Sequence, residues 1–385
     1  MHVNSIKARI IRNVYRFAFL IPRQKKLWVF GAWDGRLYAD NPKYLFEYIN
    51  RNHPEIQAIW ITKESKVKKR IESNGYKCYL QFSIRGIIAA MRAEVSFMTS
   101  DERTDISPFV NRRRTIVVEL WHGIAPKGMK WARNDDLQPV NDRYQQYYWM
   151  ATSERYRDVF SKGLLVDANK FFITGYSRND SFVVKPYNEN MEELIRKHKG
   201  DRFVVYMPTH RNYGKTPIDI SEFPIIDAKL REQHIVMLYK PHFNELKNLA
   251  VEDGQFTNIL IARDQELWGD VYSYIHYFDL LISDYSSIVY DFLCADKPIV
   301  LYTYDLEDFR QNDFGLMDYF EEIPPGPFCF TWDETISQSV ELLKNDTWKQ
   351  KRNICRKMFH PFEDGKNSER IYEATKLILA EKRYR

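Results

Sequence analysis

The sequence is poor in the residues that build metal centres and disulfide frameworks. Its four cysteines, Cys78, Cys294, Cys329 and Cys355, are scattered without metal-ligand spacing. Its nine histidines form no HExxH pattern, and its aspartates form no DxD triad. We therefore expect no bound metal and no cofactor. Few, scattered cysteines are typical of a protein that is kept in a reduced, cytosolic compartment.

Long apolar runs are also missing. No uncharged run approaches the length of a membrane span, and the apolar run at residues 17–22 is too short for the core of a signal peptide. The composition, with 44% hydrophobic and 28% charged residues, is that of a globular protein. At 385 residues the chain is too long for one ordinary core, so we expect two domains.

Acidic residues are absent before Asp34, whereas basic residues are frequent there. Apolar residues at positions 3, 6, 10, 14 and 17 fall on one helical face, which predicts a basic amphipathic helix within residues 1–25. Such a helix can lie in the headgroup layer of an anionic membrane, or it can pack on the domain with its basic face in water. The one-sided charge favours peripheral attachment at the cytoplasmic face of the membrane. The modest net charge of +5 gives no reason to expect a nucleic-acid partner. The basic residues before Asp34 are Lys7, Arg9, Arg12, Arg16, Arg23, Lys25 and Lys26.

Short apolar runs alternate with helical patterns along the rest of the chain. This alternation predicts two α/β domains, residues 26–185 and 200–385, joined by a polar connection. Asn41 and Pro42 are expected to cap and open a helix. Helices near residues 333–344 and 368–382 close the chain, and the last one can also pack back on the first domain. The predicted strands lie at residues 26–30, 58–62, 95–99, 115–120, 148–152, 171–174, 203–207, 235–239, 258–262, 280–283 and 299–302.

The stretch from residue 279 to residue 302 has the pattern of a strand, a tight loop, a helix and a second strand. The loop carries Asp284, Ser286 and Ser287 at the carboxyl end of the first strand. Hydroxyl groups at a helix amino terminus lie beside unpaired N–H groups and the positive end of the helix dipole, which suits a phosphate group. The simpler interpretation is that one of the serines only caps the helix.

Four more polar loops follow predicted strands. They contain residues 121–123, 175–180, 208–211 and 240–242. Open α/β sheets bind ligands outside the carboxyl ends of their strands. Two such sheets that face each other would close these loops around one cleft.

The side chains in these loops suit the chemistry of a phosphorylated substrate. His122 can accept a proton near neutral pH, Arg211 offers a fork that matches phosphate oxygens, and His242 can donate to a phosphate or a leaving group. Asp305 and Glu307 lie in an acidic loop that can hold hydroxyl groups such as those of a ribose. Each residue also has a structural interpretation, such as a hydrogen-bonded core histidine, a surface ion pair or a solvated helix start.

Several motifs resemble, in the same order, those of the CDP-glycerol glycerophosphotransferases of teichoic acid synthesis. They are WHG at 121–123, PTHR at 208–211, KPH at 240–242 and DYSS at 284–287. Residues 38–48, 304–309 and 364–370 are similar to the same family, so the resemblance covers nearly the whole chain from residue 26. Two departures are His210, where family members often have tryptophan, and Asn244, where they have proline.

The resemblance implies a GT-B fold, in which two Rossmann-like domains face a central cleft and the second holds the nucleotide. It implies that His122 is the general base and that His242 is a further catalytic group. It also implies that His242, Arg211, Ser286 and Ser287 contact the pyrophosphate of the donor. The motif residues Thr209, Asp284, Asp305 and Glu307 are expected to complete the donor site, and Lys127 and Lys130 are expected to bind the acceptor.

The activity that the resemblance implies is transfer of glycerol phosphate from CDP-glycerol to a hydroxyl group of a lipid-linked saccharide acceptor, with release of CMP. The compact chain with its basic leading helix is similar to the primase-like members. A CDP-ribitol-dependent or polymerising member is an alternative within the family. A GT-B glycosyltransferase that uses a nucleotide sugar and a non-catalytic module that binds anionic glycans are alternatives of other classes. The nucleotide released, and whether the protein turns over at all, distinguish them.

Overall fold

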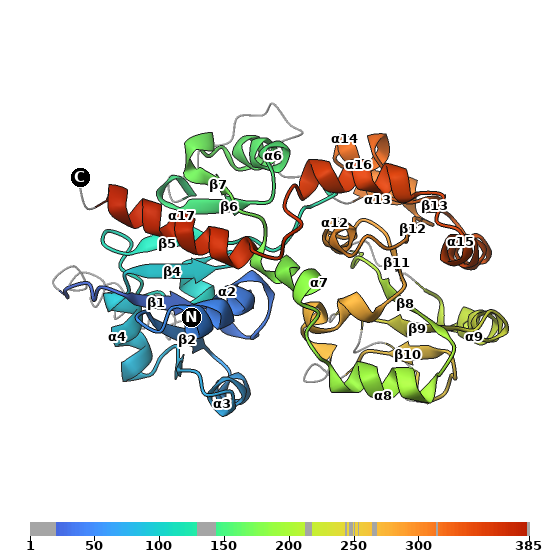
Figure 1. Cartoon of the computed structure of the whole chain (residues 1–385), viewed down its shortest axis with the longest axis horizontal. Helices are drawn as coiled ribbons and strands as arrows, with labels where there is room; N and C mark the ends of the chain where they lie inside the picture. Colours follow the sequence, from blue (N-terminus) through green and yellow to red (C-terminus); the bar gives the residue numbers. More distant parts are fainter. Residues whose placement is uncertain are drawn as a thin grey trace, which may run out of the picture.

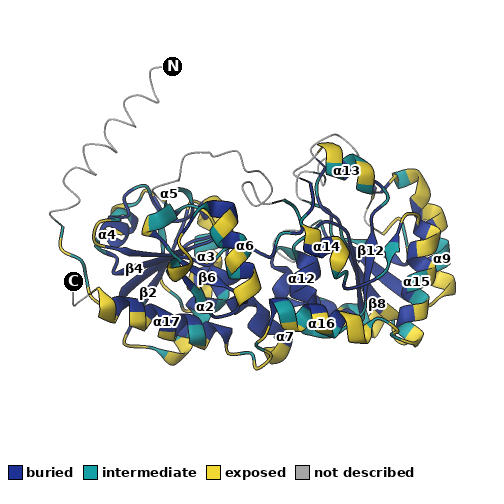
Figure 2. Cartoon of the chain, turned by 90° about the horizontal axis from the view of Figure 1, so that it is seen from above, coloured by how far each residue is buried: buried dark blue, intermediate teal, exposed yellow. Residues whose placement is uncertain are grey.

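The computed structural model describes residues 21–128, 144–211, 218–242, 245, 249, 251–252, 254–263, 268–312 and 315–382. Within these residues the chain forms two parallel sheets, each with helices on both faces (Figure 1). The sheets are buried, and the covering helices expose one face to solvent (Figure 2). The observed architecture is the predicted α/β class with two Rossmann-like domains.

The first sheet has seven strands in the order β3-β2-β1-β4-β5-β6-β7, and all its strand pairs are parallel. Its central strands are apolar and buried on both faces, as is usual for parallel strands that are covered on both sides. The chain reverses its direction of growth between β1 and β4, which creates a crevice at their carboxyl ends. The strands are β1 (Leu27–Phe30), β2 (Gln57–Thr62), β3 (Cys78–Leu80), β4 (Val95–Met98), β5 (Ile116–Glu119), β6 (Tyr148–Ala151) and β7 (Phe171–Ile173).

The second sheet repeats this plan with six parallel strands in the order β10-β9-β8-β11-β12-β13. Its reversal lies between β8 and β11, so that a second crevice opens beside the DYSS loop after β11. The strands are β8 (Arg202–Met207), β9 (Ile235–Tyr239), β10 (Ile259–Ile261), β11 (Leu280–Ser283), β12 (Ile299–Tyr302) and β13 (Phe328–Cys329).

The helices fall into those of the first domain, those of the second and those that link the two. The first group is α2 (Asp40–Asn52), α3 (Ser65–Ser73), α4 (Ile84–Arg92), α5 (Glu102–Asp105) and α6 (Glu154–Leu164). The linking helices are α7 (Ser181–Val184) and α17 (Asn367–Glu381). The second group is α8 (Glu189–Lys197), α9 (Phe223–Glu232), α12 (Ile288–Phe292), α13 (Leu306–Asn312), α14 (Asp318–Glu322), α15 (Trp332–Lys344) and α16 (Lys349–Phe359).

The segment expected to be a polar connection is helical instead. It contains α7 and α8, and α8 joins the second domain through Tyr277, whose hydroxyl donates to Glu192 at 2.9 Å. The side chain of Asn188 caps α8 by accepting from the backbone N–H of Met191. The surface of α8 is polar and Met191 is its single buried residue, so the sequence shows no apolar periodicity there.

The last helix, α17, crosses back to the first domain and lies along its sheet (Figure 1). Ile371, Tyr372 and Ile378 are buried in the same apolar cluster as β1 and α2. The start of α17 is fixed by Asp180, whose carboxylate accepts from the backbone N–H groups of Asn367 and Ser368 at 2.8 and 2.9 Å. The chain therefore passes twice between the two domains.

Candidate active site between the two domains

A cavity of about 330 Å³ lies between the two domains and is lined by both. The first domain contributes His122, Asp40, Trp33 and Arg178, which follow β5, β1 and β7. The second domain contributes the ends of β8, β9 and β11. Its lining residues include Pro208, Lys240, His242, Asp270, Tyr272, Ser286 and Ser287. Most of the polar loops that follow strands thus converge on one cleft.

His122 lies half-buried in the cavity wall, and its tautomer is set by one hydrogen bond. Its Nδ1 atom is 2.9 Å from the carbonyl oxygen of Thr99 at the end of β4. A carbonyl oxygen can only accept, so Nδ1 carries the proton and the lone pair of the neutral ring is on Nε2. The ring stacks on Trp121 with centroids 4.4 Å apart. The arrangement suits a general base that uses Nε2.

Thr99 is itself held by a buried carboxylate. The backbone N–H and the hydroxyl group of Thr99 both donate to Asp105 at 2.9 Å. Asp105 also accepts from the backbone N–H groups of Asp34 and Ser100, and burial raises its pKa although these bonds lower it. The carbonyl group that orients His122 therefore belongs to a rigid turn.

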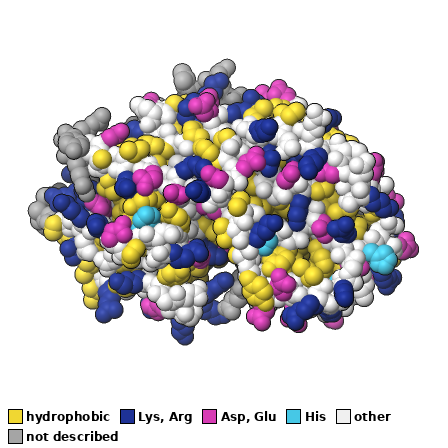
Figure 3. All heavy atoms as spheres, in the orientation of Figure 1, with side chains coloured by type: hydrophobic (Ala, Val, Ile, Leu, Met, Phe, Trp, Pro, Cys, Tyr) yellow, Lys and Arg dark blue, Asp and Glu magenta, His cyan; other side chains and the backbone are white. Residues whose placement is uncertain are grey.

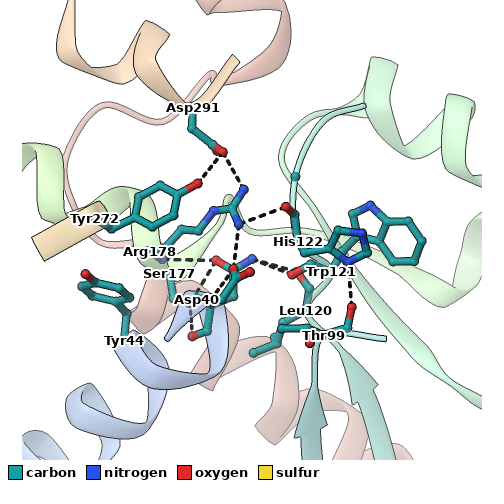
Figure 4. Close-up of polar contacts among 12 residues, drawn as sticks. Asp40, Tyr44, Thr99, Leu120, Trp121, His122, Ser177, Arg178, Tyr272 and Asp291 are labelled. Atoms are coloured by element: carbon teal, nitrogen blue, oxygen red, sulfur yellow. Dashed lines mark hydrogen bonds and ion pairs between the residues drawn. The ribbon is translucent and has the colours of Figure 1, made fainter. Parts of the chain in front are cut away.

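The loop that carries His122 is fixed from two other elements (Figure 4). The side-chain amide of Asn41 donates to the carbonyl oxygens of Leu120 and Trp121 at 3.1 and 2.9 Å. This matters because Trp121 has a φ of +58°, a conformation that a bulky residue rarely adopts. Asn41 was expected to be a helix cap, but the residue before α2 is Ala39 and Asn41 clamps this loop instead.

Lys240 and His242 lie in the cavity wall of the second domain, which also contains Asp270. Burial, together with the charges of His210, Lys127 and Lys240, lowers the pKa of His242 to about 4. Burial also lowers the pKa of Lys240. The ring of His242 stacks on that of His210 with centroids 5.1 Å apart. A diphosphate bound here would relieve the repulsion among these groups.

Ser286 and Ser287 form the neighbouring part of the wall. Both are half-buried and line the cavity, whereas Asp284 and Tyr285 are buried beneath them. Gly123, next to His122, approaches so closely that a Cβ atom at its position would lie 2.5 Å from the Oγ atom of Ser287. The WHG and DYSS loops therefore touch across the cleft.

Arg211 is placed differently from the expectation of direct contact with a phosphate. Its side chain has no exposed surface, and its guanidinium group donates to Asp305 at 2.7 and 2.9 Å and to Asp284 at 2.8 Å. Asp284 also accepts from the backbone N–H of Thr209 at 2.8 Å. None of these four residues lines the cavity, and together they tie the ends of β8, β11 and β12 to one another.

Lys127 and Glu307 also lie away from the places expected for them. The ammonium group of Lys127 is 5.3 Å from the centre of the Phe309 ring in the second domain, and its backbone pairs with Leu316. Its charge acts on His242, which puts it near the second-domain wall of the cleft. Glu307 is exposed and pairs with Arg310. Lys130 and Asn244 lie outside the described residues, as do residues 1–20 of the predicted amino-terminal helix.

Sequence reasoning assigned no role to Trp33, Asp40, Arg178, Asp270 and Tyr272, all of which line the cavity. Arg178 lies in a polar loop after a strand, and Asp40 lies in a segment similar to the family, so both carried a signal. Neither Asp270 nor Tyr272 belongs to a sequence motif, so nothing in the sequence marked them as site residues.

The described residues offer neither a metal-binding cluster nor a membrane-spanning helix. They contain no group of three or more His, Cys, Asp or Glu side chains that could hold a metal ion. They also contain no helix that is both long enough and apolar enough to cross a membrane.

Comparison with known proteins identifies the family of the chain. Residues 13–376 match the family model of CDP-Glycerol:Poly(glycerophosphate) glycerophosphotransferase. The chain is 26% identical to a teichoic acid poly(glycerol phosphate) polymerase of Bacillus spizizenii, over 97% of this chain and 98% of that protein. It is 24% identical to a teichoic acid glycerol-phosphate transferase of Staphylococcus aureus, over 96% and 98% of the two chains.

The fold is also shared with a solved structure. The wall teichoic acid polymerase TagF superposes with a TM-score of 0.78 at 19% identity, over 99% of this chain and 97% of that chain. Because the family model covers almost the whole chain, the protein belongs to the CDP-glycerol glycerophosphotransferase family, as its ordered motifs predicted.

Proposed function

We propose that the protein transfers glycerol phosphate from CDP-glycerol to a hydroxyl group of a lipid-linked saccharide acceptor and releases CMP. One observation carries this proposal. A histidine with its basic nitrogen on Nε2 lines the cavity from one domain, and Lys240, His242 and two serine hydroxyls line it from the other. A base and a diphosphate site on opposite walls are what an attack on a bound phosphate requires.

The reaction follows from these groups. Nε2 of His122 takes the proton of the acceptor hydroxyl as its oxygen attacks the β-phosphorus, which carries the glycerol. The bond between the β-phosphorus and the bridging oxygen breaks, and CMP leaves with the electron pair. Charge grows on the bridging oxygen, so cationic and hydroxyl donors near it lower the barrier. Lys240, His242, Ser286 and Ser287 are the donors of this wall.

The buried network around Arg211 has a positioning role in this scheme. Arg211 is fully paired with Asp284 and Asp305, so it fixes the loops that carry Pro208 and Ser286 and does not contact the phosphate itself. Lys127 supports the donor side through its charge near His242. The acceptor then enters from the side of Trp33 and Leu37, which are partly exposed in the cavity wall.

We further propose that α4 rests on an anionic membrane surface, where a lipid-linked acceptor is found. Phe82, Ile84 and Ile88 are 62%, 79% and 46% exposed, and Arg85 between them is exposed as well. Apolar side chains beside a basic one are the pattern of an interfacial helix. On the face seen in Figure 3, basic, acidic and apolar groups are interspersed.

The test is to identify the products. Purified protein is incubated with CDP-glycerol, CDP-ribitol or a nucleotide sugar, each with a lipid-linked disaccharide analogue, and the products are analysed by mass spectrometry. We expect CMP and an acceptor that has gained one glycerol phosphate. Release of a nucleoside diphosphate would instead identify a glycosyltransferase. A lack of turnover with every donor, with binding retained, would favour a glycan-binding module. Long products would identify a polymerising member.

A further inference from the structure

Arg178 lies at the junction of the two domains and is bonded to both. One terminal nitrogen of its guanidinium group donates to Asp40 at 2.6 Å and to the carbonyl oxygen of His122 at 3.0 Å. The other donates to Asp291 of α12 at 2.5 Å (Figure 4). The side chains of Arg178, Asp40 and Asp291 are at most 4% exposed.

The second-domain end of this junction is itself fixed. Asp291 accepts a hydrogen bond from the Tyr272 hydroxyl at 2.7 Å, and the Tyr272 ring lies 4.6 Å from the centre of the Arg178 guanidinium group. Asp291 is on the short helix that begins directly after Ser286 and Ser287. A movement of the DYSS loop therefore moves a partner of Arg178.

The first-domain end reaches the catalytic loop at its most strained point. Arg178 holds the carbonyl group of His122, next to Trp121 with its φ of +58°. A loop in a sparsely populated conformation persists only when its surroundings hold it there. If the contact from Arg178 is lost, the loop keeps the clamp from Asn41 and the close approach of Gly123 to Ser287, but the carbonyl group of His122 loses its bond to the guanidinium group.

We propose that Arg178 is a positioning residue that couples the DYSS segment of the donor domain to the orientation of His122. The proposal rests on the proposed function in so far as His122 is the base, but the coupling itself can be tested without turnover. With the domains together, Asp291 holds Arg178 and Arg178 holds the His122 loop. When the domains separate, Arg178 loses Asp291 and the carbonyl group of His122 is held less firmly.

A second ion pair crosses the same junction and provides a comparison. Lys43 of α2 bonds to Asp270, which also accepts from the Tyr44 hydroxyl at 3.0 Å. Among the described residues, this pair makes no bond to the His122 loop. Removing its charge tests general loosening of the junction, whereas removing the charge of Asp291 tests the path through Arg178.

The experiment compares backbone hydrogen exchange in residues 120–125 for the wild type and for Asp291→Asn, Asp270→Asn and Asp333→Asn. Asp333 is an exposed carboxylate of the second domain that pairs with Lys229, so it is the matched control. We expect faster exchange of the His122 loop in Asp291→Asn, although that substitution is in the other domain, and unchanged exchange in Asp333→Asn. Unchanged exchange in Asp291→Asn, or equal acceleration in Asp270→Asn, would overturn the proposal.

Kinetics give a second measurement. Asp291→Asn should lower kcat by about 10- to 100-fold, the range that misplacing a catalytic group costs, and leave the Kd for CDP within about 3-fold. Tyr272→Phe, which removes one hydroxyl group, should act in the same direction and serves if Asp291→Asn does not fold. A parallel loss of CDP affinity and kcat would mean that Asp291 serves donor binding. A wild type without turnover would refute the proposed function, and hydrogen exchange would still decide the coupling.

Discussion

The hydrogen bond from His122 to the Thr99 carbonyl oxygen decides which ring nitrogen can act as a base. Because the bond uses Nδ1, only Nε2 is left with a lone pair in the neutral ring. The carbonyl group is in turn held by Asp105 through the Thr99 backbone and hydroxyl group. The buried carboxylate of Asp105 thus helps to fix the tautomer of His122 through the carbonyl oxygen of Thr99.

His122→Ala should lower turnover by about two or more orders of magnitude, the range expected for loss of a general base. CDP binding should be largely kept, since Lys240, His242 and the two serine hydroxyls belong to the other domain. Initial rates and calorimetric titration with CDP measure the two effects. His234→Asn is the control, because His234 is exposed and Asn tolerates its φ of +54°. Near-normal turnover of His122→Ala would make His122 structural.

His242 should take up a proton when the donor binds. In the free protein its pKa is lowered to about 4 by burial and by His210, Lys127 and Lys240, so it is neutral at pH 6.5. The negative charge of a diphosphate raises the pKa of a neighbouring histidine and favours its charged form. Calorimetry of CDP binding in two buffers of different ionisation enthalpy measures the proton uptake.

The control for this titration is His242→Gln, which should bind CDP with less proton uptake than the wild type. If the two proteins take up the same number of protons, His242 stays neutral in the complex and acts only through a hydrogen bond.

Arg211→Met should destabilise the protein by about 3–5 kcal/mol, because it leaves Asp284 and Asp305 buried without a counter-charge. Urea unfolding measures the loss. The matched control is Arg310→Met at the exposed pairs with Glu307 and Glu321, where we expect about 0–1 kcal/mol. A stable Arg211→Met variant that no longer binds CDP would show that Arg211 reaches the donor.

At the scale of elements, the sequence predicted best where a helix or strand shows its own signal. The strands at 280–283 and 299–302 were predicted with their observed ends, because each is an uninterrupted apolar run bounded by turn residues. The edge strands β3 and β13, of three and two residues, were not predicted, and pairing with a neighbour makes them strands.

The same distinction applies to the site. The loops of His122, His242 and Ser286 were predicted because polar residues follow apolar strands, which is a local pattern. The pairing of Arg178 with Asp291 and of Arg211 with Asp305 joins residues 113 and 94 positions apart. The sequence therefore predicted Arg211 to be a phosphate ligand, because its partners Asp284 and Asp305 are brought to it only by the packing of the sheet.

The exposed apolar residues at the start of α4 lead to a prediction about membrane binding. Replacing Phe82, Ile84 and Ile88 by serine should release the protein from anionic vesicles while activity on a soluble acceptor analogue is kept. Each side chain that leaves the membrane interface loses about 1.5–3 kcal/mol of apolar burial at most. Co-sedimentation with vesicles of varied anionic lipid content measures binding.

The control for α4 is Ile225→Ser on the second domain, where an isoleucine is also 62% exposed. Equal vesicle binding by the triple variant and the wild type would remove α4 from the membrane contact.

At the scale of the whole molecule, the two domains are joined by ionic and hydrogen-bonded contacts as well as by two passages of the chain. One chain passage carries His360, which is buried beside Asn179, with Nδ1 of the ring 3.5 Å from the Asn179 amide nitrogen. Burial and the charge of Arg178 lower its pKa to about 3. The folded protein thus keeps this ring neutral where the unfolded chain protonates it.

His360 should make the folded state less stable as pH falls. Its pKa is about 3 when folded and about 6.5 when unfolded, so the unfolded state binds more protons between these values. From pH 7.5 to pH 5 this amounts to about 2 kcal/mol, which His360→Gln should abolish. Asp180, whose pKa burial raises to about 6, acts in the opposite direction below pH 6. Urea midpoints of both proteins at pH 7.5 and 5 measure the difference.

The return of α17 to the first domain has a consequence for how the protein is made. A ribosome completes the strands of the first sheet long before it reaches residue 367, and Ile371 and Ile378 fill the core beside those strands. Until α17 emerges, the nascent first domain has an uncovered apolar surface, which is a target for chaperones. A premature stop codon near residue 365 should therefore damage the first half of the chain, although every residue of that half has been translated.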